Sequence, residues 1–139
     1  MDLIVDASIA FKWLVTEADS EAAVSLLRNH NLAAPDIILA ECRNAALTHV
    51  RRSLMSIEQA RQAERDLEAL QLPILPSIRF LTHAFTLALE LGHPIYDCIY
   101  LAAAIASDRI LVTADERFAA KVHGRDTAEK IKLLADLRT

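Results

Sequence analysis

Four acidic side chains stand where a solvated surface charge is not expected. Each lies among apolar neighbours, in the stretches IVDAS, LAECRNA, IYDCIYLA and LVTADERF. These acids are Asp6, Glu41, Asp97 and Asp115. A carboxylate among apolar residues is costly to bury unless a proton, a cation or hydrogen bonds compensate its charge. We therefore treat the four acids as candidate site residues.

A site built from these carboxylates requires a counter-charge. Two carboxylates about 5 Å apart repel each other by roughly 3 kcal/mol at an effective dielectric constant of about 20. Oxygen ligands without histidine or thiolate partners favour Mg²⁺ or Mn²⁺ over zinc. Such an ion can activate a bound water against a phosphodiester and neutralise the leaving oxygen. The residue types therefore predict metal-dependent hydrolysis of phosphate esters.

Two other interpretations compete with this one. Helix capping suits Asp97 and Asp115, which lie at predicted helix starts, but not Glu41, which lies inside a predicted helix. A phosphatase could use Asp6 as its nucleophile, but that chemistry would want an acidic partner two residues on and a dedicated lysine. Ser8 stands at that position, and no lysine is clearly placed.

Short apolar runs that alternate with longer helices predict an α/β fold with a mainly parallel sheet. Strands are expected at residues 3–5, 32–34, 110–112 and 131–134, with an extended segment at 71–76. Helices are expected at residues 9–15, 20–28, 36–52, 57–70, 78–91, 95–106 and 116–122. The segment 126–137 also suits a helix, since Asp126 and Glu129 could cap one, but we favour the strand.

This arrangement gives the acids a place in the fold. Asp6 and Asp115 each come immediately or shortly after a predicted buried strand. Ligands of parallel sheets bind beyond the carboxyl ends of the strands, so both acids are expected at one edge of the sheet. Gly92 is expected to end the helix before it as a left-handed cap, and Ser56 begins a capping-box pattern.

Composition excludes several classes of protein. Two glycines in 139 residues leave no glycine-rich phosphate loop, which excludes P-loop and dinucleotide-binding Rossmann enzymes. Cys42 and Cys98 have neither disulfide-framework nor zinc-ligand spacing. No apolar run approaches the roughly 18 residues of a membrane span, and the net charge of −4 argues against a generally basic surface for nucleic acid. We expect one domain over residues 1–139, located in the cytoplasm.

The ordered set of motifs resembles a known family. VDAS, a central helix carrying AE, PIYDCIYLA and LVTADERF resemble the PIN-domain ribonucleases, and most closely the VapC-type toxins of toxin-antitoxin modules. The resemblance spans residues 4–118. Each motif alone is weak, whereas the four in this order are specific.

The resemblance implies a three-layer α/β/α fold with a five-stranded parallel sheet. It implies that Asp6, Glu41, Asp97 and Asp115 form the catalytic metal site for Mg²⁺ or Mn²⁺, with Ser8 and Thr113 supporting the site or contacting substrate. The implied activity is endonucleolytic RNA cleavage, and the implied partners are a cognate VapB-type antitoxin and a second copy of the chain. Some members carry another aspartate after the position of Asp115. Here Glu116 follows, which leaves open whether one or two ions bind. A catalytically inactive binding or scaffold domain is the remaining alternative.

Overall fold

A five-stranded parallel sheet forms the centre of the protein. The computed structural model describes residues 1–137, and its strand order is β3-β2-β1-β4-β5. The strands are β1 Asp2–Val5, β2 Asn31–Pro35, β3 Ile74–Leu75, β4 Ile110–Thr113 and β5 Ile131–Leu133. All four pairings between neighbouring strands are parallel. The expected α/β fold is confirmed, and the C-terminal segment contains the expected strand.

Helices connect the strands. They are α1 Ala7–Leu14, α2 Ser20–Asn29, α3 Ile37–Arg51, α4 Ile57–Ala69, α5 Leu81–Leu91, α6 Ile95–Ala106 and α7 Glu116–His123. Three short 3-10 helices, η1 Ser77–Phe80, η2 Ala128–Lys130 and η3 Leu134–Asp136, complete the described elements. The helix predicted at 78–91 thus begins as a 3-10 turn directly after Pro76, and regular α-helix starts only at Leu81.

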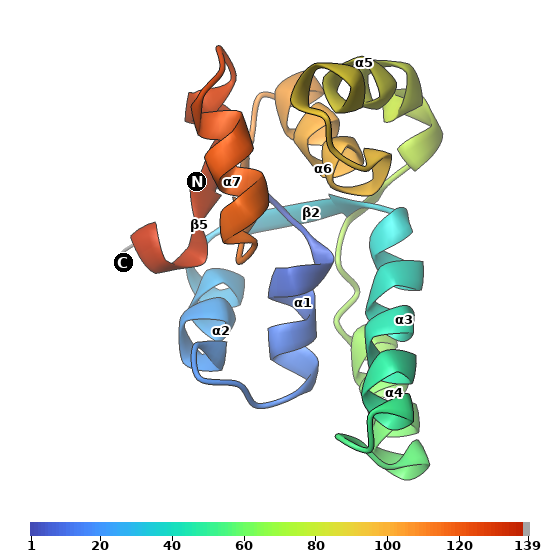
Figure 1. Ribbon diagram of the computed structural model, residues 1–139. Coiled ribbons are helices and arrows are strands. Elements are labelled where there is room, and N and C mark those ends of the chain that lie inside the picture. The colour runs from blue at the N-terminus through green and yellow to red at the C-terminus, as the bar shows by residue number, and fades with distance from the viewer. Residues whose placement is uncertain (138–139) are drawn as a thin grey trace.

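The helices form a layer on each side of the sheet (Figure 1). On one side α1 and α2 pack together, and the antiparallel pair α3–α4 packs against α1. On the other side α6 contacts β1, β2 and β4, and α5 covers α6. This is the three-layer α/β/α arrangement expected from the sequence.

The core sits between the central strands and α6. β1 and β4 are buried at nearly every position, which matches their continuous apolar sequences. Seven consecutive residues of α6, from Cys98 to Ala104, are buried. A helix that is buried all round can carry a charge only at its ends, so Asp97 in its first turn is placed at the rim of the core.

Two local signals are confirmed. Gly92 ends α5 in the left-handed region, at φ 59°, and Ser56 forms a complete capping box with Gln59 at the start of α4. Among residues 1–137, none of the helices combines the length and the apolar character needed to traverse a lipid bilayer.

Candidate active site

The topology creates a switch point between β1 and β4. From β1 the chain proceeds outward through β2 to β3, and it later returns to β4, on the other side of β1, before continuing to β5. Helices leave β1 and β4 in opposite directions at such a point, which opens a crevice at the carboxyl ends of the two strands. Asp6 directly follows β1, and Asp115 lies two residues beyond the end of β4. The expected common edge for these two acids is therefore present.

Asp6 is the most enclosed of the four acids. It caps the N-terminus of α1, where its Oδ1 accepts a hydrogen bond from the Ile9 backbone N–H at 3.2 Å and from the Ser8 hydroxyl at 2.5 Å. The residue is 5% exposed. Burial raises the pKa of its carboxyl to about 6, against the opposing effect of these hydrogen bonds, and the charge of Asp97 adds to the rise. Asp97 is thus close enough for its charge to affect Asp6.

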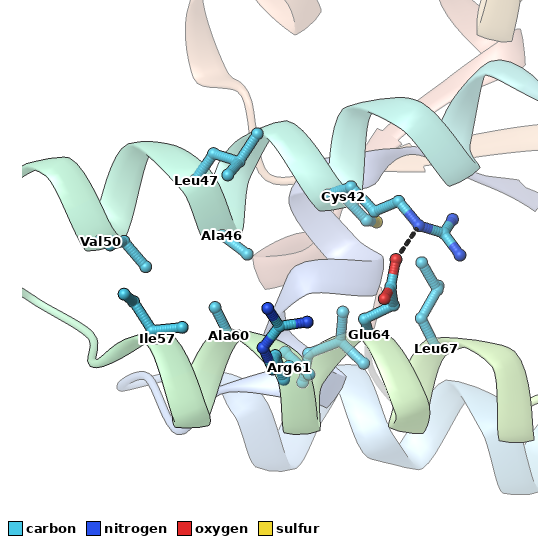
Figure 2. A pocket seen from close by; sticks show the side chains of 12 residues that line it. Cys42, Ala46, Leu47, Val50, Ile57, Ala60, Arg61, Glu64 and Leu67 are labelled. Atoms are coloured by element: carbon cyan, nitrogen blue, oxygen red, sulfur yellow. Dashed lines mark hydrogen bonds and ion pairs between the residues drawn. The ribbon is translucent and has the colours of Figure 1, made fainter.

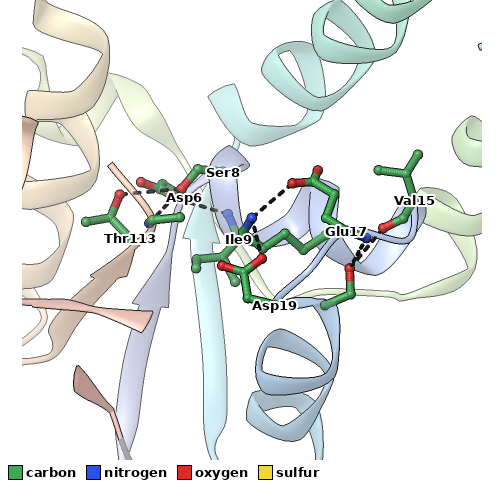
Figure 3. A network of polar contacts seen from close by, with 10 residues as sticks. Asp6, Ser8, Ile9, Val15, Glu17, Asp19 and Thr113 are labelled. Atoms are coloured by element: carbon green, nitrogen blue, oxygen red, sulfur yellow. Dashed lines mark hydrogen bonds and ion pairs between the residues drawn. The ribbon is translucent and has the colours of Figure 1, made fainter. Parts of the chain in front are cut away.

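Ser8 and Thr113 join the ends of the two central strands (Figure 3). The Ser8 Oγ lies 3.4 Å from the Thr113 Oγ1 and accepts a hydrogen bond from the Ala114 N–H at 3.0 Å. The Thr113 Oγ1 in turn accepts from the Asp115 N–H at 3.0 Å. These bonds tie the first turn of α1, which comes after β1, to the turn that follows β4. Lys12 of α1 pairs with Glu17 at 3.0 Å and with Asp19 at 2.7 Å, two residues that Figure 3 labels, so this lysine is not available to Asp6.

Asp115 lies at the same edge, with its carboxylate directed toward its own helix. Its Oδ1 accepts from the Phe118 N–H at 3.0 Å and caps the start of α7. Helix capping therefore accounts for one of the two carboxylate oxygens of Asp115. Glu116 follows in the first turn of α7 and is exposed.

Glu41 reaches the site from the second turn of α3. Its Oε1 accepts a hydrogen bond from the hydroxyl of buried Tyr100 of α6 at 2.6 Å. Burial raises the pKa of the Glu41 carboxyl, the Tyr100 bond opposes that rise, and the charge of Asp97 adds to it. Asp97 therefore acts electrostatically on both Asp6 and Glu41.

Asp97 has a histidine partner from the turn before its helix. Its Oδ2 lies 2.6 Å from the His93 Nε2, an i,i+4 contact. The side chain of His93 is 11% exposed, and its ring packs on Phe118 with centroids 4.6 Å apart.

The negative charge of the four carboxylates is not balanced by paired lysine or arginine side chains in the described part of the chain. Over residues 1–137, Asp6, Glu41, Asp97 and Asp115 form no ion pair with a lysine or arginine. Each uses one oxygen in the contacts above. In kind, this all-oxygen, uncompensated donor set fits a hard divalent ion. The four side chains do not, however, meet around a common point: within the described residues no three His, Cys, Asp or Glu side chains stand together as a ligand group. Local partners hold each acid instead.

An apolar groove runs between α3 and α4 (Figure 2). It has a volume of about 350 Å³ and its lining is mostly apolar. Arg43 closes one part of it through ion pairs with Glu64 and Glu68 of α4. Cys42, which lines the groove, follows Glu41 in sequence, so the groove reaches the α3 segment that carries this acid.

A family comparison covers most of the chain. The PIN domain family matches residues 3–123. The chain belongs to the PIN domain family. This PIN domain is 31% identical to ribonuclease VapC3 of Pyrobaculum aerophilum over 126 residues, which cover 87% of the chain and 95% of that relative.

Solved structures share the fold of this PIN domain. A toxin-antitoxin complex from Klebsiella pneumoniae matches with a TM-score of 0.69 and 16% identity, over 97% of this chain and 99% of that one. VapBC2 from Rickettsia felis, solved with a DNA fragment from its promoter, matches with a TM-score of 0.63 and 18% identity, over 96% of this chain and 98% of that one.

Sequence reasoning missed two neighbours of the acids. Tyr100 contacts Glu41 across 59 residues of sequence, and no local pattern could indicate that contact. The second neighbour is His93, which the sequence alone did not single out. It is largely buried against Asp97, and the i,i+4 spacing of the two residues was the signal that could have found it.

Proposed function

We propose that this chain is a metal-dependent endoribonuclease toxin that cleaves RNA and is neutralised by a cognate antitoxin. The proposal treats residues 1–139 as one PIN domain. The observation that supports it is that the charge of Asp97 acts on both Asp6 and Glu41, that none of the three pairs with a lysine or arginine among residues 1–137, and that Asp6 lies at the switch point of a PIN-family sheet. The identity to a ribonuclease over almost the full length supports the reaction class.

Mg²⁺ or Mn²⁺ is the proposed cofactor. Asp6, Asp97 and Asp115 would bind an ion directly, and Glu41 would bind a second ion or orient the attacking water. When bound, the ion supplies an activated water and neutralises the leaving oxygen of the phosphodiester. The protein contributes a buried aspartate held rigidly by Ser8 and Ile9. Ser8 and Thr113 keep the two strand ends in register or contact the RNA.

Each proposed ligand keeps one carboxylate oxygen outside the hydrogen bonds described above. Glu41 would turn from Tyr100 or bind through the oxygen that Tyr100 leaves unused, and Asp97 would bind through the oxygen that His93 leaves unused. Attraction to a divalent cation outweighs one hydrogen bond, which contributes about 1 kcal/mol net.

The proposed antitoxin is a VapB-type protein, as the toxin-antitoxin neighbours suggest. A short amphipathic segment suits the α3–α4 groove, whose walls are apolar. A basic side chain of that segment could extend toward Glu41 and the acids beyond it. The second copy proposed for a homodimer would dock elsewhere, on the exposed apolar face of α5.

Loss of single carboxylates tests the proposal. Asp6→Asn and Asp97→Asn should each abolish RNA cleavage and leave the circular dichroism spectrum unchanged. Asp66→Asn on α4, far from the acids in sequence and exposed, is the matched control and should cleave as wild type. RNase activity that persists in carefully purified Asp97→Asn protein would refute the site assignment. Absence of activity from wild type with Mn²⁺ would favour the alternative of an inactive binding domain.

A further inference from the structure

The His93 ring is held at every polar atom and on one face. Its Nε2 lies 2.6 Å from the Asp97 Oδ2, and its Nδ1 lies 3.1 Å from the Lys121 Nζ. Phe118 packs on the ring. The backbone N–H of His93 donates to the Ala88 carbonyl, in the turn that Gly92 makes at the end of α5. His93 is thus fixed by contacts with α5, α6 and α7 at once.

The partners determine where the ring proton lies. A lysine ammonium only donates hydrogen bonds, so the His93 Nδ1 must accept from Lys121. A neutral imidazole that accepts at Nδ1 carries its proton on Nε2, and this N–H points at Asp97. A doubly protonated ring could not accept from Lys121, and its charge would repel the ammonium. The geometry therefore gives a neutral donor, not an ion pair, beside Asp97.

Lys121 is also anchored on its other side. Its Nζ donates to the Gly92 carbonyl at 3.2 Å, so one ammonium binds both the turn and the ring. Lys121 and Phe118 belong to α7, the helix that Asp115 begins. The cluster thus connects α5, α6 and α7, and with them the helix starts that carry Asp97 and Asp115.

We propose that His93 and Lys121 are positioning residues for the acidic site: Lys121 fixes the His93 tautomer, and the His93 Nε2–H orients the Asp97 carboxylate. One Asp97 oxygen is then held by a donor while the other stays available to a cation. This inference rests on the proposed function, because it gives Asp97 a ligand role. A neutral donor suits that role, since it orients the carboxylate without cancelling the charge that attracts a metal ion.

The test uses two histidine variants that differ in where they place an amide donor. In His93→Gln the side-chain amide nitrogen can occupy the position of the His93 Nε2. The shorter side chain of His93→Asn places its amide nitrogen near the position of Nδ1 instead. His83→Asn, on the exposed part of α5, is the matched control. Mn²⁺ binding is measured by calorimetry on chelator-treated protein, and cleavage is measured with a quenched fluorescent single-stranded RNA.

We expect His93→Asn to weaken Mn²⁺ binding about 10-fold, the lower end of what loss of a ligand-orienting partner costs. The kcat should fall with little change in KM, because Asp97 does not itself bind the RNA in this scheme. His93→Gln should restore most of both quantities. If His93→Asn equals the His83→Asn control while wild type binds Mn²⁺ and cleaves RNA, the positioning role is overturned and the nuclease function stands.

A second measurement reads the tautomer directly. Long-range ¹⁵N–¹H spectra of the metal-free protein at neutral pH should show His93 protonated at Nε2 alone. Lys121→Met should change that pattern and weaken Mn²⁺ binding, Lys121→Arg should preserve both, and Lys132→Met, at the exposed position of β5, is the control. A ring protonated at Nδ1, or at both nitrogens, in wild type overturns the inference even if His93→Asn fails to fold. Wild type that neither binds Mn²⁺ nor cleaves RNA overturns the proposed function, and the inference with it.

Discussion

The role of Asp6 as a helix cap and its proposed role as a metal ligand place opposite demands on its charge. As the N-cap of α1 it needs only an oxygen that accepts from Ile9 and Ser8, and an asparagine supplies that oxygen equally well. As the proposed metal ligand it must be charged. Without metal, its charge is buried and close to Asp97, and burial raises its pKa to about 6. The metal-free site therefore lowers the stability of the fold at neutral pH.

The pH dependence of unfolding should reveal this cost. The folded protein binds the Asp6 proton more tightly than the unfolded chain, whose pKa is near 3.8. Stability from this group is therefore fully present below about pH 4 and is lost as the pH rises through about 6. The shift corresponds to at most about 3 kcal/mol. In EDTA, Asp6→Asn should be more stable than wild type at pH 7.5 by up to that amount, and nearly equal to it at pH 4.

Urea unfolding across this pH range measures the effect. Asp126→Asn, at an exposed site, should follow the wild-type curve throughout. Parallel curves for wild type and Asp6→Asn would show that the buried carboxyl does not have the raised pKa.

Tyr100 gives a second prediction, because its hydroxyl has one partner within the described residues. Tyr100→Phe removes the 2.6 Å bond to Glu41 and leaves that half-buried carboxylate without its donor. Loss of a hydrogen bond to a charged group costs about 1.5–3 kcal/mol of unfolding free energy, and we expect the lower part of that range because Glu41 keeps contact with water. Tyr96→Phe, on the same helix but 57% exposed, should change stability by less than about 0.5 kcal/mol. Equal effects of the two variants in urea unfolding would refute the role of this bond.

Among the elements, those with strong local signals were predictable. Continuous apolar runs gave β1 and β4, and the capping box at Ser56 gave the start of α4. β3 is only two residues long and has no pattern of its own beyond the flanking prolines. It forms because Ala34 and Pro35 of β2 offer it a parallel partner. The acids were found because apolar flanks mark them, whereas their partners His93 and Tyr100 depend on how α5, α6 and α3 pack.

Gly92 shows how one residue sets the junction of two elements. At φ 59° a side chain is strained by about 1–2 kcal/mol, even though a Cβ at Gly92 would meet nothing within 4 Å. We expect Gly92→Ala to lower the unfolding free energy by about 1 kcal/mol through backbone strain alone. Gly124, at φ −84°, also has room for a Cβ, so Gly124→Ala is the matched control and should be neutral or slightly stabilising. Equal losses in thermal or urea unfolding would contradict the left-handed cap.

The surface of the whole molecule is uneven in apolar character. Leu81, Phe85 and Leu89 lie four residues apart along α5 and are 41%, 58% and 69% exposed. Ile78, one turn earlier, is 78% exposed. The opposite face of α5 packs into the core through Ala84 and Leu87. An exposed apolar stripe on a helix whose other face is already buried is typical of a protein interface.

This stripe is where we expect the proposed homodimer to form. Phe85→Glu would place a charge at the centre of the interface, and the dimer dissociation constant should rise at least about 10-fold, since a central aromatic residue commonly contributes 2 kcal/mol or more. Leu54→Glu, at an equally exposed leucine after α3, is the control and should leave the dimer intact. Sedimentation equilibrium measures both. A wild type that stays monomeric, or a dimer that Leu54→Glu and not Phe85→Glu disrupts, would exclude the α5 stripe as the interface.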